Sequence, residues 1–302
     1  MIDPMRRRPS PSTLTWVARS ISHDATVVGY RRLTGGITSS VHQLSVDSKG
    51  SRRHVVLRRW IGADRDQAAA TVEREAEVLV ALAGSGIGAP ELLAASVDGA
   101  DTDGCPTLLM TRVAGRPNLT PLDPGAWIGQ IAEVLPRIHS LAMDLPPVAS
   151  WRPLLERGVP PWTRRPHLWR EAITLLEGKD PGGDCFIHND FQHFNLLWRR
   201  ERLSGIVDWT WSGRGAADRD VGHCRLNLAV LFSVDWAERF RRAYEAEAGR
   251  RIDRWWDVHE LALYSCGWQR FIPIQVGGRT SVDLGGMHDR VEHLLALTLA
   301  KI

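Results

Sequence analysis

The sequence has very little lysine, since Lys49, Lys179 and Lys301 are the only ones among 302 residues, and arginine supplies nearly all of the positive charge. The formal net charge of +3 is small for this length, so neither nucleic acid nor an anionic membrane is indicated as a partner. No apolar run approaches the roughly 18 residues that span a bilayer. The arginines at 6–8 are not followed by an apolar stretch, so the start of the chain does not resemble a signal peptide.

Cysteine is also scarce, and the four residues are too scattered for a CxxC pair or a disulfide framework: Cys105, Cys185, Cys224 and Cys266. A reduced, cytoplasmic environment is expected. The composition, 43% apolar and 24% charged, is typical of a soluble globular protein. A chain of this length can form one domain with two lobes or two closely packed domains.

The pattern of the first third predicts strands around one main helix. The expected strands are 26–33, 40–46, 54–60, 91–97 and 107–113, and the helix is 66–83. From Pro124 onward the periodicity is mostly helical, with expected helices at about 168–177, 222–232, 235–248, 253–269 and 283–299. We therefore expect an α+β fold, with a β-rich lobe at 1–112 and a helical lobe at 113–302. Residues 1–24 are expected to be a leading helix or a flexible segment.

The segment from His188 to Asn195, followed by Asp208, carries the strongest chemical signal. Asp190 and Asn195 are five positions apart on a loop that follows a short strand, and Asp208 ends a second apolar run. This combination of two carboxylates and a carboxamide suits phosphoryl transfer from a magnesium-bound nucleotide. One Asp accepts a proton from the attacking hydroxyl, while Asn and the other Asp hold the metal.

Other readings of these residues stay open. Each residue alone also fits an ordinary Asx-turn or a solvated strand end. The histidines 188, 193 and 223 suggest a zinc site or a metallohydrolase, although histidines in a tryptophan-rich chain are more often packed in the core. A metallohydrolase predicts phosphate release without a nucleotide.

The segment resembles the aminoglycoside phosphotransferase and choline kinase-like family, whose pattern is His-x-Asp-x-x-x-x-Asn followed by an apolar strand ending in Asp-Trp. The resemblance covers about 28–297 and implies a two-lobe, protein-kinase-like fold. It implies that Asp190 is the catalytic base, that Asn195 and Asp208 bind Mg²⁺, and that His188 fixes the loop. This chain has Gln192 and two further residues, at 193 and 194, where relatives often have His-Pro-Gly. The triplets typical of protein kinases are absent.

The resemblance also implies a nucleotide site in the small lobe. Gly35 and Gly36 lie in a turn between two strands, where the backbone and Ser39 would contact phosphate oxygens. An ordinary glycine turn is the alternative. The strand ending in Gly115 resembles the inter-lobe hinge, where the Thr111 carbonyl and the Val113 amide would contact the adenine.

The cation that orients the phosphates is usually a lysine on the third strand, but here Leu57 is followed by Arg58. We interpret Arg58 as the substitute, although the two side chains are not equivalent. Its expected partner is Glu75 on the following helix, with Glu73 as the rival. Farther on, Asp220 matches a structural Asp of the family and is expected to cap the helix after it.

The expected activity is transfer of phosphate from ATP or GTP, with Mg²⁺, to a small-molecule hydroxyl acceptor. Asp257 and Glu260 are the candidate acceptor residues, because aminoglycosides are polycations. The expected acceptor is an aminoglycoside-like antibiotic or a related metabolite, and a choline- or homoserine-type metabolite kinase is an alternative. The other alternative is a degenerate, kinase-like nucleotide-binding module. A monomer or homodimer is expected.

Overall fold

The computed structural model describes residues 7–33 and 38–300, which form two compact units. The N-terminal unit runs to Ala114 and also includes Gly205–Thr210, whereas Gly115–Ser204 and the chain from Trp211 on form the C-terminal unit. The sequence predicted one boundary after residue 112 and did not predict that Gly205–Thr210 would belong to the N-terminal unit. This matters because it places Asp208 with the N-terminal unit.

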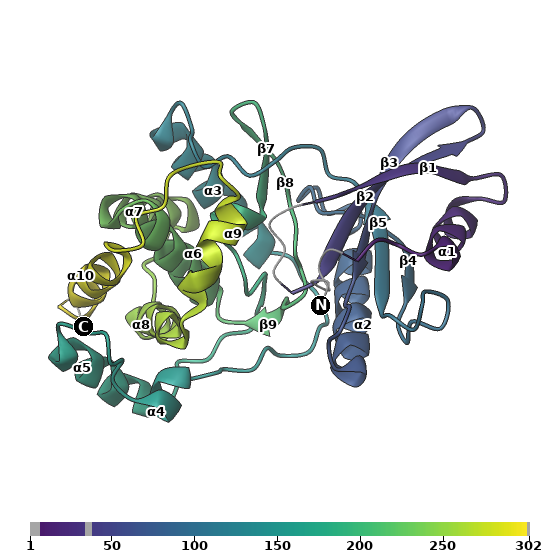
Figure 1. The fold of residues 1–302 in the computed structure, drawn as a ribbon. Coiled ribbons are helices and arrows are strands. Elements are labelled where there is room, and N and C mark those ends of the chain that lie inside the picture. The colour runs from purple at the N-terminus through teal and green to yellow at the C-terminus, as the bar shows by residue number, and fades with distance from the viewer. Residues whose placement is uncertain (1–6, 34–37, 301–302) are drawn as a thin grey trace. The chain divides into compact units, whose positions relative to one another are not determined.

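The N-terminal unit is built on an antiparallel five-stranded sheet with the order β1-β2-β3-β5-β4 (Figure 1). Its elements are α1 (Pro11–Ile21), β1 (Thr26–Arg32), β2 (Ser40–Ser48), β3 (Ser51–Arg59), α2 (Arg65–Leu82), β4 (Leu92–Ser96) and β5 (Thr107–Thr111). The five strands and the main helix predicted from the sequence are confirmed. The leading segment contains a helix, α1, which Ser10 caps by accepting a hydrogen bond from the Thr13 amide.

Alternation along β3 sends neighbouring side chains to opposite faces of this sheet. Leu57 is buried with Leu44, Val55 and Val17 of α1 in an apolar core on one face. Arg58, the next residue, therefore projects from the other face, where it contacts α2. The alternation thus places an apolar core on one side of the strand and a charged group on the other.

The C-terminal unit is mainly helical (Figure 1). Its elements are α3 (Pro124–His139), α4 (Pro153–Arg157), α5 (Pro166–Glu177), β6 (Cys185–Ile187), β7 (Leu196–Arg199), β8 (Arg202–Ile206, whose end joins the first unit), β9 (Gly213–Gly215), α6 (Ala217–Leu231), α7 (Val234–Ala248), α8 (Arg254–Ala262), α9 (Ile272–Val276) and α10 (Met287–Leu299). Strands β7 and β8 pair, and β6 pairs with β9. The β6–β9 pair lies on either side of the predicted catalytic segment in the sequence.

Helix α6 is the central helix of this unit, because it contacts α7, α8, α10 and β6. Nearly all of its residues are buried, including the charged residues Arg219, Asp220 and Arg225. A buried charge needs a partner, since desolvation costs several kcal/mol per ion. The charged residues of α6 are therefore expected in ion pairs or hydrogen bonds, and this is where the structure places them.

The helix expected over 253–269 is wrong in its length, since α8 ends at Ala262. Two short 3₁₀ turns follow, Leu263–Cys266 and Trp268–Phe271, separated by Gly267. Gly267 has φ 75°, a left-handed conformation that glycine adopts readily and that ends a helix. Between Ala262 and Gly267 the chain stays coiled as a 3₁₀ turn, which a sequence pattern does not distinguish from an α-helix.

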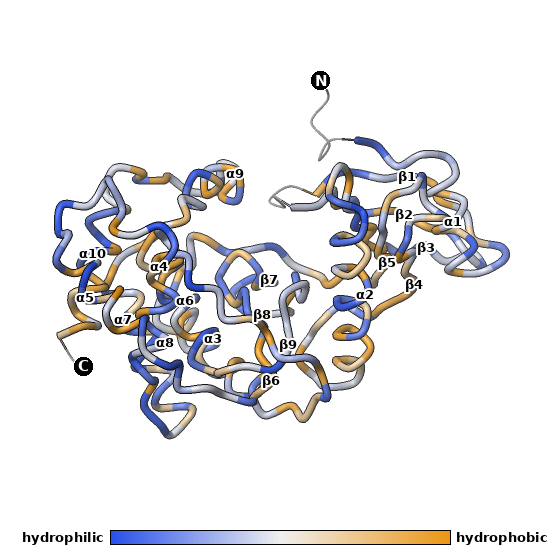
Figure 2. The backbone as a smooth tube through the Cα atoms, turned by 90° about the horizontal axis from the view of Figure 1, so that it is seen from below, coloured by the Kyte–Doolittle hydropathy of each residue, from blue (hydrophilic) through white to orange (hydrophobic). Residues whose placement is uncertain are grey.

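Apolar residues are distributed in short runs along the backbone of both units (Figure 2). Within residues 7–33 and 38–300, no helix is long and apolar enough to cross a membrane.

Candidate active site

The N-terminal unit buries the predicted phosphate cation, Arg58, in a polar cluster. Its Nη1 donates to Glu75 Oε1 and Oε2 at 2.9 and 3.0 Å and lies 2.8 Å from Asp208 Oδ1. Its Nε donates to Ser39 Oγ at 2.8 Å, and the guanidinium lies over the ring of Trp60. Arg58 therefore links the β3 strand to the partner helix and to Asp208.

Glu75, not Glu73, is the partner of Arg58. Glu75 is 1% exposed and also accepts a hydrogen bond from Thr210 Oγ1 at 3.2 Å, whereas Glu73 is exposed. Burial lowers the pKa of Arg58, but the charges of Asp208 and Glu75 outweigh it and raise the pKa above its ordinary value. Arg58 is therefore a charged guanidinium, a group that does not deprotonate in proteins.

Asp208 follows β8 in a left-handed backbone conformation, with φ 68°. Three residues earlier, Gly205 lies where no side chain fits, since an added Cβ would be 2.4 Å from Gly88 O and from Val113 Cγ1. The Ile206 amide donates to the same Gly88 carbonyl at 3.3 Å. This close backbone approach fixes the segment that carries Asp208 within the N-terminal unit.

The remaining nucleotide-site predictions concern backbone groups. Thr111 ends β5 and is tied to Glu91, whose amide donates to Thr111 Oγ1 at 2.8 Å. Val113 lies two residues beyond the strand and is half-buried. Gly35 and Gly36 lie outside the described residues. The adenine contacts and the phosphate turn therefore stay predictions.

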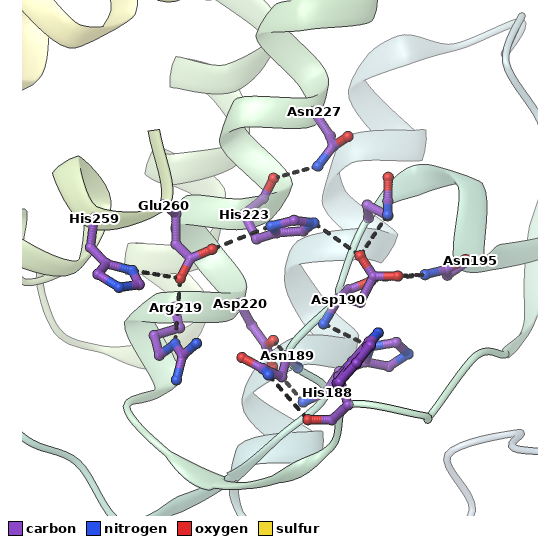
Figure 3. A network of polar contacts seen from close by, with 12 residues as sticks. His188, Asn189, Asp190, Asn195, Arg219, Asp220, His223, Asn227, His259 and Glu260 are labelled. Carbon is purple, nitrogen blue, oxygen red and sulfur yellow. Dashed lines mark hydrogen bonds and ion pairs between the residues drawn. The ribbon is translucent and has the colours of Figure 1, made fainter. Parts of the chain in front are cut away.

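In the C-terminal unit, three side chains donate to or pair with the Asp190 carboxylate (Figure 3). Gln192 Nε2 donates to Oδ1 at 2.7 Å, and His223 Nε2 lies 3.0 Å from the same oxygen. Asn195 Nδ2 donates to Oδ2 at 2.9 Å and to the Asp190 backbone carbonyl at 2.9 Å. Asp190 and Asn195, predicted to act together, are therefore in direct contact.

Asp220 holds the backbone of the catalytic loop. Its two carboxylate oxygens accept hydrogen bonds from the amides of His188 and Asn189 at 2.8 and 2.7 Å. This bonding supports Asn189 in a left-handed conformation, with φ 62°. The expectation that Asp220 caps the following helix is wrong, because α6 begins earlier, after Ala216, with no side-chain cap.

His188 is fully buried and forms hydrogen bonds within and beside the catalytic loop. Its Nδ1 accepts from the Asp190 amide at 3.3 Å, and its carbonyl accepts from Ser212 Oγ at 3.0 Å. His188 thus joins the loop before Asp190 to the segment that enters α6.

His223 is the contact of Asp190 that the sequence analysis did not assign to the phosphotransferase site. Its Nδ1 lies 3.3 Å from Glu260 Oε2, so the imidazole is placed between two carboxylates. Burial lowers the pKa of His223, but the hydrogen bonds and charges of Asp190 and Glu260 outweigh it and raise the pKa to about 10. The sequence does place His223 one helical turn after Asp220, which puts it near the catalytic loop. That spacing does not show which carboxylate the imidazole contacts.

These features match a known family of proteins along most of the chain. Residues 29–256 match the model of the phosphotransferase enzyme family. The chain belongs to that family. No curated protein sequence matches this family member at a significant level.

Solved structures show the same fold. A candidate aminoglycoside phosphotransferase from Ralstonia eutropha is 17% identical with a TM-score of 0.64, and the match covers 97% of this chain and 98% of that one. A thermostable mutant of the aminoglycoside phosphotransferase APH(4)-Ia, in a ternary complex with ADP and hygromycin B, is 17% identical with a TM-score of 0.61 and coverages of 94% and 98%. The streptomycin–ATP complex of APH(2″)-IIa is 17% identical with a TM-score of 0.55 and coverages of 91% and 93%. At these identities the likeness shows the protein-kinase-like α+β fold of the aminoglycoside phosphotransferases.

The candidate acceptor residues of this phosphotransferase-family chain lie in buried ion pairs. Asp257 is fully buried and pairs with Arg225, and its Oδ2 accepts from Thr298 Oγ1 at 3.2 Å. Glu260 is 3% exposed and contacts His223 and Arg219. Neither carboxylate is exposed to solvent.

The alternative hypothesis, a zinc site formed by the histidines, receives no support from the described residues. Within 7–33 and 38–300, no group of three or more His, Cys, Asp or Glu side chains is arranged to hold a metal ion. His193 is fully buried and packs against Phe194 and Phe232. Burial, followed by the positive charges of His223 and Arg279, lowers the pKa of His193 to about 3, so it is a neutral core residue.

Proposed function

We propose that the protein transfers the γ-phosphate of ATP or GTP to a hydroxyl of an aminoglycoside-like antibiotic or a related metabolite. The observation that carries the proposal is the Asp190 carboxylate, which is 24% exposed while donor groups orient it from within the unit. A positioned and accessible carboxylate is what a general base for a hydroxyl requires.

The proposed roles follow from the contacts of each residue. The acceptor oxygen attacks the γ-phosphorus, and the bond from that phosphorus to the bridging oxygen breaks and leaves its electron pair on the nucleoside diphosphate. The hydroxyl proton passes to Asp190. Arg58, held by Glu75, Ser39 and Asp208, supplies a fixed positive charge toward the phosphates.

Asn195 and Asp208 fit the oxygen chemistry of Mg²⁺, and we propose them as its ligands. The Asn195 amide nitrogen donates to Asp190, so its amide oxygen is the atom directed elsewhere. Asp208 has a side chain that is 34% exposed. Carboxylate and carbonyl oxygens are the ligands that Mg²⁺ prefers, and the ion when bound neutralises phosphate charge.

Asp257 and Glu260 have internal partners, so the described structure does not favour a polycationic acceptor over a neutral one. An acceptor panel must therefore include neutral hydroxyl compounds beside aminoglycosides, macrolides and choline- or homoserine-like metabolites. Mass spectrometry with MgATP should show a phosphate mass gain on at least one acceptor, accompanied by ADP.

The control is Asp190→Ala, which should abolish the mass gain and keep thermal stabilisation by MgATP. Stabilisation by MgATP without transfer to any acceptor would favour a degenerate nucleotide-binding module. Transfer that survives undiminished in Asp190→Ala would overturn the role of Asp190.

A further inference from the structure

The imidazole of His223 lies between two carboxylates of the C-terminal unit (Figure 3). Its Nε2 is 3.0 Å from Asp190 Oδ1 and its Nδ1 is 3.3 Å from Glu260 Oε2. A neutral imidazole has a single N–H, whereas an ionised carboxylate only accepts. With both carboxylates ionised, both contacts are hydrogen bonds only if both ring nitrogens carry a proton, so the geometry favours an imidazolium.

Glu260 is itself held in place, which gives the imidazolium a fixed anchor. Its Oε1 lies 3.0 Å from His259 Nδ1 and 3.4 Å from Arg219 Nε. Gly222 lets α8 approach α6 at this point, because an added Cβ would be 3.0 Å from Glu260 Cβ. Burial raises the pKa of Glu260, but the bonds to His223 and His259 and the charge of Arg219 outweigh it and lower the pKa well below its ordinary value.

The charges around His223 come from several elements. Asp190 faces it from the catalytic loop and Glu260 from α8, while His193 from the loop is neutral. Arg279 acts on His193 from the segment after α9. Burial lowers the pKa of His223, but the hydrogen bonds and charges of the two carboxylates outweigh it and raise the pKa to about 10.

The two oxygens of Asp190 differ in how many donors they meet. Oδ1 faces two donors, Gln192 Nε2 at 2.7 Å and His223 Nε2 at 3.0 Å. Among the described residues, Asn195 Nδ2 is the one side-chain donor that meets Oδ2. Because each carboxylate oxygen has about two lone-pair sites, Oδ1 is saturated and Oδ2 has capacity for one more donor.

We infer that His223, as an imidazolium anchored on Glu260, is a positioning residue that turns the Asp190 carboxylate so that Oδ2 receives the proton of the acceptor hydroxyl. This inference rests on the proposed function. Gln192 cannot replace His223 in this role, because it belongs to the same loop as Asp190 and its side chain bonds to no helix within the described residues. Among the described residues, His223 is the side chain that joins the Asp190 carboxylate to Glu260 of α8.

The charge state can be measured on the wild-type protein without any acceptor. Nitrogen-15 NMR of the His223 ring at about pH 7.5, where a free histidine is mostly neutral, should show two protonated nitrogens. The signal is assigned with His223→Gln. A ring with one unprotonated nitrogen would overturn the inference, whatever the activity of the enzyme.

The positioning role is tested with the acceptor found in the screen. His223→Gln removes the positive charge. The glutamine amide has one NH₂ group, so it does not present two opposed donors to Asp190 and Glu260 as the imidazolium does. We expect kcat to fall on the order of 100-fold, since small misplacements of a reacting group have effects of that size. The KM for the nucleotide and the stabilisation by MgATP should stay unchanged, and His223→Lys, which keeps a cation, should recover part of the loss.

Asn227→Ala is the matched control, because Asn227 lies one turn farther along α6 and its side chain donates to the His223 carbonyl at 3.0 Å, away from the imidazole. It should lose a little stability and keep kcat. Unchanged kcat in His223→Gln, or equal losses in His223→Lys and His223→Gln, would overturn the positioning role. Wild-type protein that phosphorylates no acceptor would instead contradict the proposed function, and the NMR result would still decide the charge state.

Discussion

Each unit of the molecule holds a buried cation between one buried carboxylate and one more exposed carboxylate, but the two cations differ in kind. In the N-terminal unit the cation is Arg58, the buried carboxylate is Glu75 and the exposed one is Asp208. The side chains of Glu75 and Asp208 are 2% and 34% exposed. A permanent charge occupies this position, since a guanidinium does not deprotonate in proteins.

In the C-terminal unit the cation is His223, the buried carboxylate is Glu260 and the exposed one is Asp190. Here the neighbours create the charge, because an isolated histidine would be mostly neutral at physiological pH. The difference indicates two tasks. A permanent cation suits a site that must attract phosphate, and a planar ring with two opposed donors suits a site that must fix the direction of one carboxylate.

The largest effects are expected from replacing the more exposed carboxylate of each cluster, Asp190 or Asp208. Asp190→Asn should lower kcat by about 10²- to 10⁴-fold, the usual contribution of a general base, and should keep the stabilisation by MgATP. Asp208→Asn should instead reduce that stabilisation, because Asp208 is a proposed metal ligand. Rates are measured by phosphate mass gain on the acceptor, and stabilisation by thermal unfolding. Equal effects of the two variants on nucleotide binding would contradict the separation of roles.

The next effect is on stability, at the permanent cation. Arg58→Met leaves Glu75 and Asp208 without their common partner, and breaking a buried pair in this way costs about 3–5 kcal/mol. Urea unfolding measures the loss. Arg58→Lys should cost less, because it keeps the charge and loses the bond from Nε to Ser39.

Two glutamates on α2 supply a matched control for the Arg58 pair. Glu75→Gln should be clearly destabilising because its carboxylate is buried against Arg58, whereas Glu73→Gln on the exposed side should stay within about 0.5 kcal/mol. A larger loss for Glu73→Gln would mean that the pairing is misassigned.

The sequence predicted the N-terminal cluster better than the C-terminal one, for a physical reason. Alternation along β3 and the position of Glu75 on the next helix are local patterns, and the family resemblance assigned both residues. The contact of His223 with Glu260 depends on how α6 packs against α8, which no spacing within either helix shows. Asp257 and Glu260 were expected at the acceptor because aminoglycosides are polycations, and the burial of both depends on the same helix packing.

Two buried histidines, His42 and His223, should make the free energy of unfolding depend on pH in opposite directions. Burial, then the charges of Arg59 and Arg32, lowers the pKa of His42 from 6.5 to about 4. Unfolded chains bind its proton between these values and native ones do not, so its contribution to stability is complete above 6.5 and is lost as the pH falls toward 4. The slope is about 1.4 kcal/mol per pH unit for one group.

His223 has the opposite sign, since its native pKa is about 10 against 6.5. Its contribution is complete below 6.5 and is lost as the pH rises toward 10. The free energy of unfolding is measured against pH for the wild-type protein, His42→Gln and His223→Gln. The difference between wild type and each variant, plotted against pH, gives the slope for that histidine. Slopes of the same sign would refute the assignment of one neutral and one charged histidine.

The smallest effect expected is at Gly222, where stability and activity should separate. In Gly222→Ala the new Cβ meets Glu260 Cβ at 3.0 Å and the Trp256 carbonyl at 3.2 Å, so α8 must move by a few tenths of an ångström. Alanine gains about 0.8–1 kcal/mol of helix propensity over glycine, which offsets most of the strain, so urea unfolding should change by less than about 1 kcal/mol. Because the movement reaches Glu260 and through it His223, kcat should still fall several-fold. Unchanged kcat with a clear loss of stability would mean that Glu260 only packs the helices and does not orient Asp190.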